Sequence, residues 1–282
     1  MLHDQILRPI HPTGESEVCR EGGVTGLAGA FTGEWIEPQE FRLPGEPESR
    51  LVAINDQGAF GAELLRTLAT RLRLAQRRHL IKKLVVTSAV PGEGKTVVSA
   101  NLAITLALHQ DRVLLIDGDL RSSNLSRWFG VVDEKFTSRW QVEGLRQLPL
   151  LRKAERLPLW VIPAGKPVEM PGKILQTAEF REALEAIERD FEWIVIDSPP
   201  LVPFGDAGVL TSLADAVVLV TRKDVTPKAA LRDALKTIDK SKIIVTILNC
   251  ARTTNRRYYH EYYSHLRSAL PAPGHIEERR RG

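Results

Sequence analysis

The sequence of 282 residues predicts a three-layer α/β fold, in which a mostly parallel β-sheet carries helices on both faces. Short runs that are apolar at every position alternate with helical patterns, which is typical of parallel strands buried on both sides. A glycine-containing loop joins the first of these strands to a helix, and aspartates end two later strands. With 43% hydrophobic residues, the chain can bury the core that such a sheet requires.

The expected elements follow in order. The first helix, at 60–77, has apolar residues at 64, 65, 68 and 72, and this spacing near 3.6 predicts an amphipathic helix on the edge of the domain. Residues 142–157 suggest a short helical excursion. Strands are predicted at 84–88, 112–117, 159–163, 193–197, 216–221 and 243–248. Further helices are predicted at 95–109, 176–189, 205–213 and 227–239.

Composition divides the chain into three regions. Residues 1–50 are dense in Gly, Pro and Glu and are expected to be a flexible segment, 51–250 form the folded domain, and 251–282 are a basic tail. Seven arginines against three glutamates place the whole net charge of +4 in that tail.

The sequence predicts a cytoplasmic protein. The start of the chain is polar, and no apolar run approaches the ~20 residues that a membrane helix requires. The two cysteines suit no disulfide framework.

The loop after the strand at 84–88 reads Pro-Gly-Glu-Gly-Lys-Thr and leads into a helix. Strand, glycine-containing loop, Lys-Thr and helix together predict a phosphate-binding loop and a P-loop NTPase-like fold, because freed backbone N–H groups and the helix N-terminus attract an anion. Lys95 is expected to reach the β- and γ-phosphates of ATP, and the Thr96 hydroxyl to ligate Mg²⁺. Ala89 replaces the usual first glycine of the motif. The predicted nucleotide contacts are Gly92, Glu93, Gly94, Lys95, Thr96 and Val97.

Three aspartates are expected to face this loop. Asp117 and Asp119 lie two residues apart at the end of the strand at 112–117, so they can point to the same side. Asp197 ends the strand at 193–197, which has the form of a Walker B element. Ligands of open α/β sheets bind beyond the carboxyl ends of the strands, where these acids and the loop would meet. Carboxylates facing a triphosphate require a cation between them, so Mg²⁺ is expected.

Asn249 follows the last predicted strand, at 243–248. Its amide has the donors and the acceptor to contact an adenine edge, and it equally suits the end of a strand. The sequence leaves both interpretations open.

All four tyrosines of the chain, Tyr258, Tyr259, Tyr262 and Tyr263, lie within six positions of the tail. On a helix they would form an aromatic stripe for docking, and among arginines they could stack on bases. Phenylalanine, used eight times elsewhere, is absent from this segment, which favours a need for the phenol hydroxyl. In a protein expected to bind a nucleotide, these hydroxyls are predicted to accept phosphoryl groups.

The segments SAVPGEGKT, VLLIDGDLR and WIVIDSPP, with the tyrosine cluster, resemble the bacterial P-loop tyrosine autokinases of capsule and exopolysaccharide synthesis, over roughly 51–265. The resemblance implies that Lys95 and Thr96 bind phosphates and Mg²⁺, that Asp117 and Asp119 form an additional Walker A′ motif with one of them as base or metal ligand, and that Asp197 is the Walker B acid. It also implies phosphorylation of the tail tyrosines, usually in a neighbouring subunit of a ring. Added negative charge on adjacent tyrosines would repel such neighbours.

The same resemblance implies partners. A membrane-embedded activator or polysaccharide co-polymerase is expected, because the transmembrane half fused in some members does not occur in this sequence. It would recruit the protein to the inner face of the plasma membrane, a homo-oligomer is expected, and a protein-tyrosine phosphatase would act as antagonist. Family members often carry E-x-x-R-x-x-R in the helix before the loop; here Glu63 and Arg66 match but the third position is Ala69, for which Arg71 or Arg73 could compensate.

Two other functions fit parts of the sequence. Partitioning and division-site ATPases share the fold, but they carry an additional lysine early in the loop, and this chain has none between Lys83 and Lys95. A nucleotide-gated scaffold of a polysaccharide assembly complex would bind ATP without transferring phosphate; the acids and the tyrosine cluster argue against it. Binding of nucleic acid is not expected, because the basic charge is confined to one tail.

Overall fold

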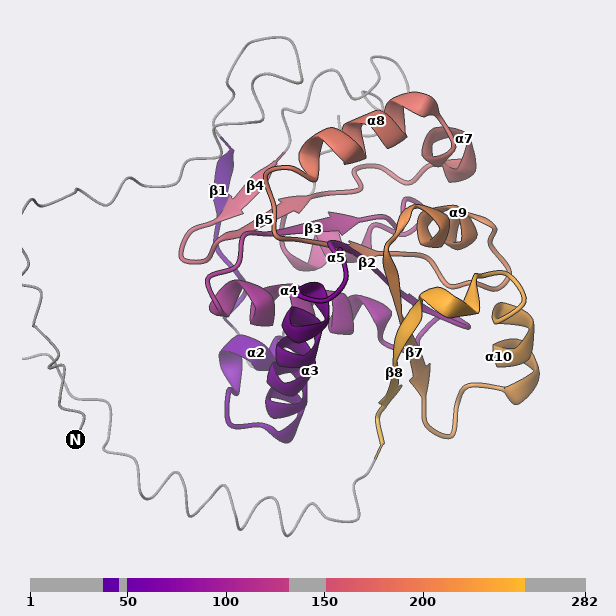
Figure 1. The fold of residues 1–282 in the computed structure, drawn as a ribbon, viewed down its shortest axis with the longest axis horizontal. Coiled ribbons are helices and arrows are strands. Elements are labelled where there is room, and N and C mark those ends of the chain that lie inside the picture. Colours follow the sequence, from indigo (N-terminus) through magenta and orange to yellow (C-terminus); the bar gives the residue numbers. More distant parts are fainter. Residues whose placement is uncertain (1–37, 46–49, 132–150, 252–282) are drawn as a thin grey trace, which may run out of the picture.

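The computed structural model describes residues 38–45, 50–131 and 151–251, and these residues form one layered α/β unit (Figure 1). A single eight-stranded sheet runs through it. Helices α3 and α4 lie on one face of this sheet and helix α8 on the other, so the predicted three-layer architecture is confirmed.

The elements alternate along the chain as the sequence predicts. The strands are β1 (Gln39–Phe41), β2 (Lys83–Ser88), β3 (Val113–Asp117), β4 (Arg152–Ala154), β5 (Leu159–Ile162), β6 (Trp193–Asp197), β7 (Ala216–Arg222) and β8 (Ile243–Asn249). The helices are α2 (Val52–Asn55), α3 (Phe60–Gln76), α4 (Lys95–Leu108), α5 (Asn124–Trp128), α7 (Pro171–Leu175), α8 (Ala178–Ile187), α9 (Asp206–Leu213), α10 (Lys228–Ala234) and the 3₁₀ turn η3 (Lys240–Lys242).

The strand order is β1-β4-β5-β3-β6-β2-β7-β8. In this order, the six neighbouring strands β5, β3, β6, β2, β7 and β8 run parallel to one another. Strand β4 pairs antiparallel to β5, and β1 pairs parallel to β4. In the centre of the sheet β3 and β6 pair in register, with Asp117 opposite Asp197. The carboxyl ends of β3, β6, β2, β7 and β8 therefore follow one another along one edge of the sheet.

The two faces of the sheet carry separate apolar clusters, because neighbouring side chains of a strand point to opposite sides. Leu84 and Val86 of β2 pack under α3 and α4, whereas Val85 between them packs with α8 and α9. Burial of each such side chain contributes roughly 1.5–3 kcal/mol to folding. A sheet buried on both faces is why its central strands are apolar at every position.

Helix α4 begins at Lys95, directly after the glycine-containing loop, and most of its residues are buried against the sheet. Its apolar side chains contact β2, β3 and β6 on one side and helices α2 and α3 on the other. Asn101 of α4 accepts a hydrogen bond from the Ala53 N–H at 3.0 Å and donates to the Arg50 carbonyl at 3.0 Å, which ties α2 to this helix. The loop is therefore anchored to the most deeply packed helix of the structure.

Two strands of three residues, β1 and β4, differ from the sequence-based expectations. Gln39–Phe41 lie in the segment expected to be flexible, but they form β1, where Phe41 stacks on Phe129 with ring centroids 5.9 Å apart. The prediction of a helical excursion is wrong in its described part, because 152–154 form β4. Strands of three residues are too short to show a hydrophobic period in the sequence.

The helix ends lie close to the predicted positions, with two exceptions. Helix α8 begins two residues later than expected, because the Thr177 hydroxyl accepts the Phe180 N–H at 3.2 Å and so caps the helix. Helix α10 ends at Ala234 rather than near 239. None of the helices in the described ranges combines the length and the apolar character needed to cross a bilayer.

Candidate active site

The predicted site residues of the folded domain gather at the carboxyl edge of the sheet. The phosphate-binding loop follows β2, Asp117 and Asp197 end β3 and β6, and Asn249 ends β8. Since these strands are neighbours in the sheet, residues far apart in the sequence meet at one place.

The loop has the backbone conformation that an anion cradle requires. Gly92 and Gly94 have φ values of +79° and +95°, a region that favours glycine. At Gly94 a Cβ atom would also lie 2.2 Å from the Asn249 side-chain nitrogen. Position 94 therefore requires glycine for two independent reasons, the positive φ angle and the close contact with the Asn249 side chain at the end of β8.

Glu93 and Asn249, both predicted to contact the nucleotide, contact each other in the structure. The Asn249 amide nitrogen donates to the Glu93 carbonyl at 2.8 Å, and the amide oxygen accepts the Cys250 N–H at 2.8 Å. The Glu93 side chain is fully buried and accepts the Val90 N–H at 2.8 Å. Contact between Glu93 and a nucleotide would therefore involve its backbone N–H, and base contact by Asn249 remains a prediction.

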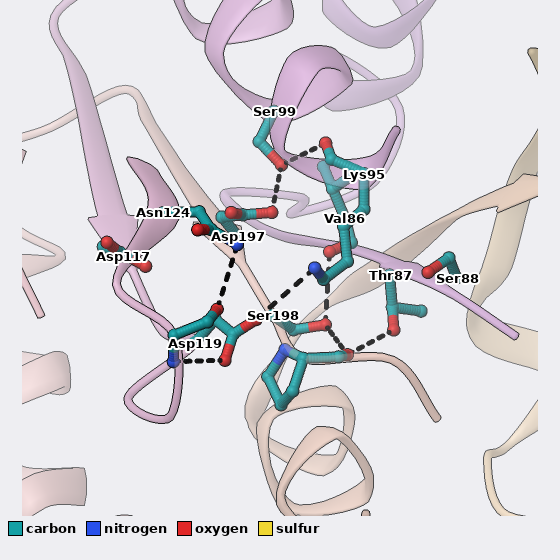
Figure 2. Close-up of polar contacts among 12 residues, drawn as sticks. Val86, Thr87, Ser88, Lys95, Ser99, Asp117, Asp119, Asn124, Asp197 and Ser198 are labelled. Atoms are coloured by element: carbon teal, nitrogen blue, oxygen red, sulfur yellow. Dashed lines mark hydrogen bonds and ion pairs between the residues drawn. The ribbon is translucent and has the colours of Figure 1, made fainter. Parts of the chain in front are cut away.

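Lys95 extends from the start of α4 toward Asp119 (Figure 2). Its Nζ atom lies 3.4 Å from Asp119 Oδ2, and both side chains are about nine-tenths buried, with 10% and 7% of their area exposed. A salt bridge with so little solvent is weakly screened. The lysine predicted to bind phosphate is thus held against Asp119, one of the two acids of the predicted Walker A′ motif.

Asp117 and Asp197 form a buried pair of carboxyl groups on adjacent strands. The pKa of Asp117 is raised to about 7, chiefly by burial and also by the charge of Asp197, while hydrogen bonds from Ser126 oppose the rise. Burial likewise raises the pKa of Asp197 to about 6, against the charge of Lys95 and hydrogen bonds from Thr96 and Ser99. Raised pKa values in a polar cluster are typical of functional sites.

Two serines of this site have no motif that identifies them in the sequence. Ser126 of α5 donates its hydroxyl and its N–H to the same Asp117 oxygen, at 2.6 and 2.9 Å. Ser99 of α4 donates to Asp197 at 2.9 Å, and Figure 2 shows this bond between the helix and the strand end. Each serine lies on a helix beside a recognisable feature, but only the tertiary fold brings it to its aspartate.

Gly118, between the two aspartates of the predicted Walker A′ motif, packs directly on β6. Its N–H donates to the Asp197 carbonyl at 2.8 Å, and a Cβ atom there would lie 2.8 Å from that same oxygen. Real Cβ atoms do not approach a backbone oxygen so closely. The absence of a side chain therefore allows Asp117 and Asp119 to turn past the end of β6.

The site fits a bound Mg²⁺ by the chemistry of its oxygen atoms. Asp117 Oδ1 and Asp197 Oδ2 are buried without a hydrogen-bond partner among the described residues. Across 38–45, 50–131 and 151–251, no three Asp, Glu, His or Cys side chains converge as a metal cage. Mg²⁺ suits this arrangement, because proteins usually hold it with one or two carboxylates while phosphates and water complete its shell.

The predicted phosphoryl acceptors lie outside the described residues, which end at Ala251. Tyr258, Tyr259, Tyr262 and Tyr263 therefore remain predictions from the sequence. Asn249, which contacts the loop, precedes the first of them by nine residues.

Comparison with known proteins matches this geometry. A family described as "AAA domain" matches residues 81–247. Tyrosine-protein kinase YwqD of Bacillus subtilis is 27% identical over 76% of this chain and 92% of its own length. Tyrosine-protein kinase CpsD of Streptococcus pneumoniae serotype 4 is 34% identical over 62% of this chain and 75% of its own length. Among solved structures, the VpsO kinase domain aligns with a TM-score of 0.57 and 28% identity, over 69% of this chain and 100% of that domain.

The family match at 81–247 spans the loop and the strand-end acids Asp117, Asp119 and Asp197. The chain therefore belongs to the AAA-domain family and, within it, to the P-loop tyrosine-protein kinases of bacteria.

Proposed function

We propose that this protein transfers the γ-phosphoryl group of ATP to tyrosines of its own C-terminal tail and thereby regulates capsule or exopolysaccharide synthesis and export. The observation that carries the proposal is the buried contact between Lys95 and Asp119 at 3.4 Å, at the end of a strand beside the phosphate-binding loop. This contact places Lys95, the candidate phosphate-binding cation, directly beside Asp119, the candidate base. The tyrosine cluster supplies acceptors, and kinship with tyrosine-protein kinases supports the reaction class.

The residues of the loop bind and orient the nucleotide. The N–H groups of Gly92, Glu93, Gly94 and the first residues of α4, Lys95, Thr96 and Val97, surround the phosphates, and the helix N-terminus favours their negative charge. Thr96, Asp117 and Asp197 would hold Mg²⁺, which when bound neutralises charge on the phosphates. Ser99 and Ser126 keep the two carboxylates in place.

Arrival of the phosphates changes the partner of Lys95. In the structure its ammonium group contacts Asp119. Phosphate oxygens compete for that cation, which leaves the Asp119 carboxylate free to contact the hydroxyl of the incoming tyrosine. Asp119 then takes the phenol proton while the tyrosine oxygen bonds to the γ-phosphorus and the bond to the bridging oxygen of ADP breaks.

The finer assignments belong to the same proposal. Residues 51–250 act as the kinase domain and 251–282 as the substrate tail. A membrane-embedded activator or co-polymerase recruits the protein to the inner face of the membrane, copies of the chain assemble, and a phosphatase removes the phosphoryl groups. Kinship with the tyrosine-protein kinase CpsD supports such an activator.

The test is phosphotyrosine mapping by mass spectrometry after incubation of the full chain with Mg-ATP, with and without candidate activator peptides. Labelling is expected on Tyr258–Tyr263 and is lost in Lys95→Met and in the variant with all four tyrosines changed to Phe. Lys236→Met is a matched control, because Lys236 is exposed just beyond the end of α10 and its ion pair is with Asp233.

Each alternative has a distinct outcome in the same experiment. Hydrolysis of ATP without tyrosine labelling would favour the partitioning class of ATPase. Nucleotide binding with neither reaction would favour a scaffold. Labelling that persists in Lys95→Met would contradict the proposed use of the loop.

A further inference from the structure

Glu93 is an unusual residue at the centre of the phosphate-binding loop. Its side chain has 0% of its area exposed, and no described lysine or arginine forms an ion pair with it. A buried carboxyl group is costly unless donors satisfy it. A negative charge at this position would also repel the phosphates of a nucleotide. We therefore expect the Glu93 side chain to support nucleotide binding by shaping the loop and not by direct contact.

The carboxyl group is satisfied from two sides. Glu93 Oε2 accepts the Val90 N–H at 2.8 Å, which closes the loop on itself. Glu93 Oε1 accepts the hydroxyl of Thr226, from the connection between β7 and α10, 133 residues away in the sequence. The Thr226 oxygen is itself held by the Arg222 N–H at 2.8 Å. One hydroxyl therefore links the loop to the end of β7.

Two further contacts reach the loop from the same side. The Arg222 guanidinium donates to the Gly92 carbonyl at 3.3 Å, and the Asn249 amide donates to the Glu93 carbonyl at 2.8 Å. Arg222, Thr226 and Asn249, here called the brace, thus hold two successive carbonyls and the side chain between them. All three lie at or just beyond the carboxyl ends of β7 and β8.

The brace determines where the loop N–H groups point. The peptides after Gly92 and Glu93 are trans, so each N–H points opposite to the carbonyl of the preceding residue. With both carbonyls turned toward the brace, the N–H groups of Glu93 and Gly94 face away from it. Neither N–H donates to another described residue. Two successive free N–H groups form the concave donor set that binds phosphate.

We propose that Thr226 is a positioning residue of the nucleotide site: through the Glu93 carboxylate it fixes the loop so that the Glu93 and Gly94 N–H groups face the phosphates. This inference rests on the nucleotide-binding part of the proposed function and not on tyrosine transfer. Thr226 lies in no recognised motif, and its effect on the nucleotide is exerted entirely through Glu93.

The test compares Thr226→Val, which removes the hydroxyl at nearly constant shape, with Thr226→Ser, which keeps it. Binding of Mg-ADP to the full chain is measured by calorimetry. Loss of a hydrogen bond to a charged group predicts roughly ten-fold weaker binding for Thr226→Val, and Thr226→Ser is expected within about two-fold of the wild type. Thr237→Val is the matched control, because the Thr237 hydroxyl bonds to the Ala234 carbonyl within its own turn and not to the loop.

Hydrogen exchange of the nucleotide-free protein separates positioning from general destabilisation. Thr226→Val is expected to speed exchange at Val90, whose N–H donates to the Glu93 carboxylate, while exchange in β2 stays as in Thr237→Val. Equal acceleration in the loop and in β2, wild-type affinity in Thr226→Val, or equal weakening in Thr226→Ser would each overturn the proposal. Failure of the wild type to bind Mg-ADP would overturn it together with the proposed function, whereas binding without tyrosine labelling would contradict the kinase reaction alone.

Discussion

The buried pair of Asp117 and Asp197 predicts an unusual dependence of stability on pH. The pKa of Asp117 rises from the ordinary 3.8 to about 7, chiefly through burial. Between roughly pH 4 and pH 7 the folded protein therefore keeps a proton that the unfolded chain releases. The free energy of unfolding then falls as the pH rises through this window, and the contribution is fully lost above the folded-state pKa.

The substitution Asp117→Asn isolates this effect, because the amide cannot ionise while its oxygen can still accept both Ser126 hydrogen bonds. A rise of the pKa from 3.8 to about 7 corresponds, at 1.36 kcal/mol per pKa unit, to about 4 kcal/mol. The variant is thus expected to exceed the wild type in stability by up to about 4 kcal/mol at pH 8, and by almost nothing near pH 4.

The measurement is urea unfolding of nucleotide-free, Mg²⁺-free protein at several pH values from 4.5 to 8. Titrating groups that do not interact with Asp117 cancel in the difference between variant and wild type. Asp233→Asn is the control: this aspartate is exposed and its pKa is lowered by Lys236, so its difference should stay flat over the same range. A gap between Asp117→Asn and the wild type that does not widen with pH would refute the reasoning.

Three further substitutions test the packing around the site. Gly118→Ala would place a Cβ 2.8 Å from the Asp197 carbonyl and is expected to cost roughly 1–3 kcal/mol of stability and most of the kinase activity, measured by thermal unfolding and phosphotyrosine assay. Gly94→Ala would place a Cβ 2.2 Å from the Asn249 side chain at a φ of +95° and should weaken Mg-ADP binding in calorimetry by about ten-fold or more. Leu102→Ala, at a fully buried position, should cost about 2–5 kcal/mol in urea unfolding without changing the nucleotide affinity of the folded protein.

One glycine serves as the control for the first two. At Gly205 no atom lies within 4 Å of the point that a Cβ atom would occupy, and φ is −73°, so Gly205→Ala should alter neither stability nor binding appreciably. Wild-type behaviour of Gly118→Ala or Gly94→Ala would show that the strand ends or the loop adjust freely. Weakened nucleotide binding in folded Leu102→Ala would show that the core of α4 and the loop are coupled.

The central strands could be predicted because burial on both faces makes their sequences unmistakably apolar. Strand β6 is found where the sequence predicts it, at 193–197, and β3 begins one residue later than expected. The short strand β4 could not be predicted, because it is made of Arg152, Lys153 and Ala154 and takes its conformation from pairing with β1 and β5. Where local pattern is weak, tertiary pairing decides the backbone.

The residues of the site likewise fall into those that the sequence could predict and those that it could not. Lys95 and Asp119 could be placed together because the ends of parallel strands share one edge of the sheet. The partners that hold the site could not be predicted, because Ser126 and Thr226 are ordinary residues of a short helix and a connection. Their roles depend on distances between segments, for which a single sequence carries no signal.

Helix α3 bears on how copies of this chain could meet. Ala69, at the third position of the incomplete E-x-x-R-x-x-R pattern, is fully buried in the core, and Glu63 and Arg66 are paired with each other. Of the two arginines that could compensate, Arg73 is held by Asp111 at 3.0 Å, whereas Arg71 is exposed and forms no ion pair with a described residue. An arginine at position 69 would have to displace core side chains to reach solvent. A contact between copies on this helix would therefore involve Arg71, on its solvent face, rather than residue 69.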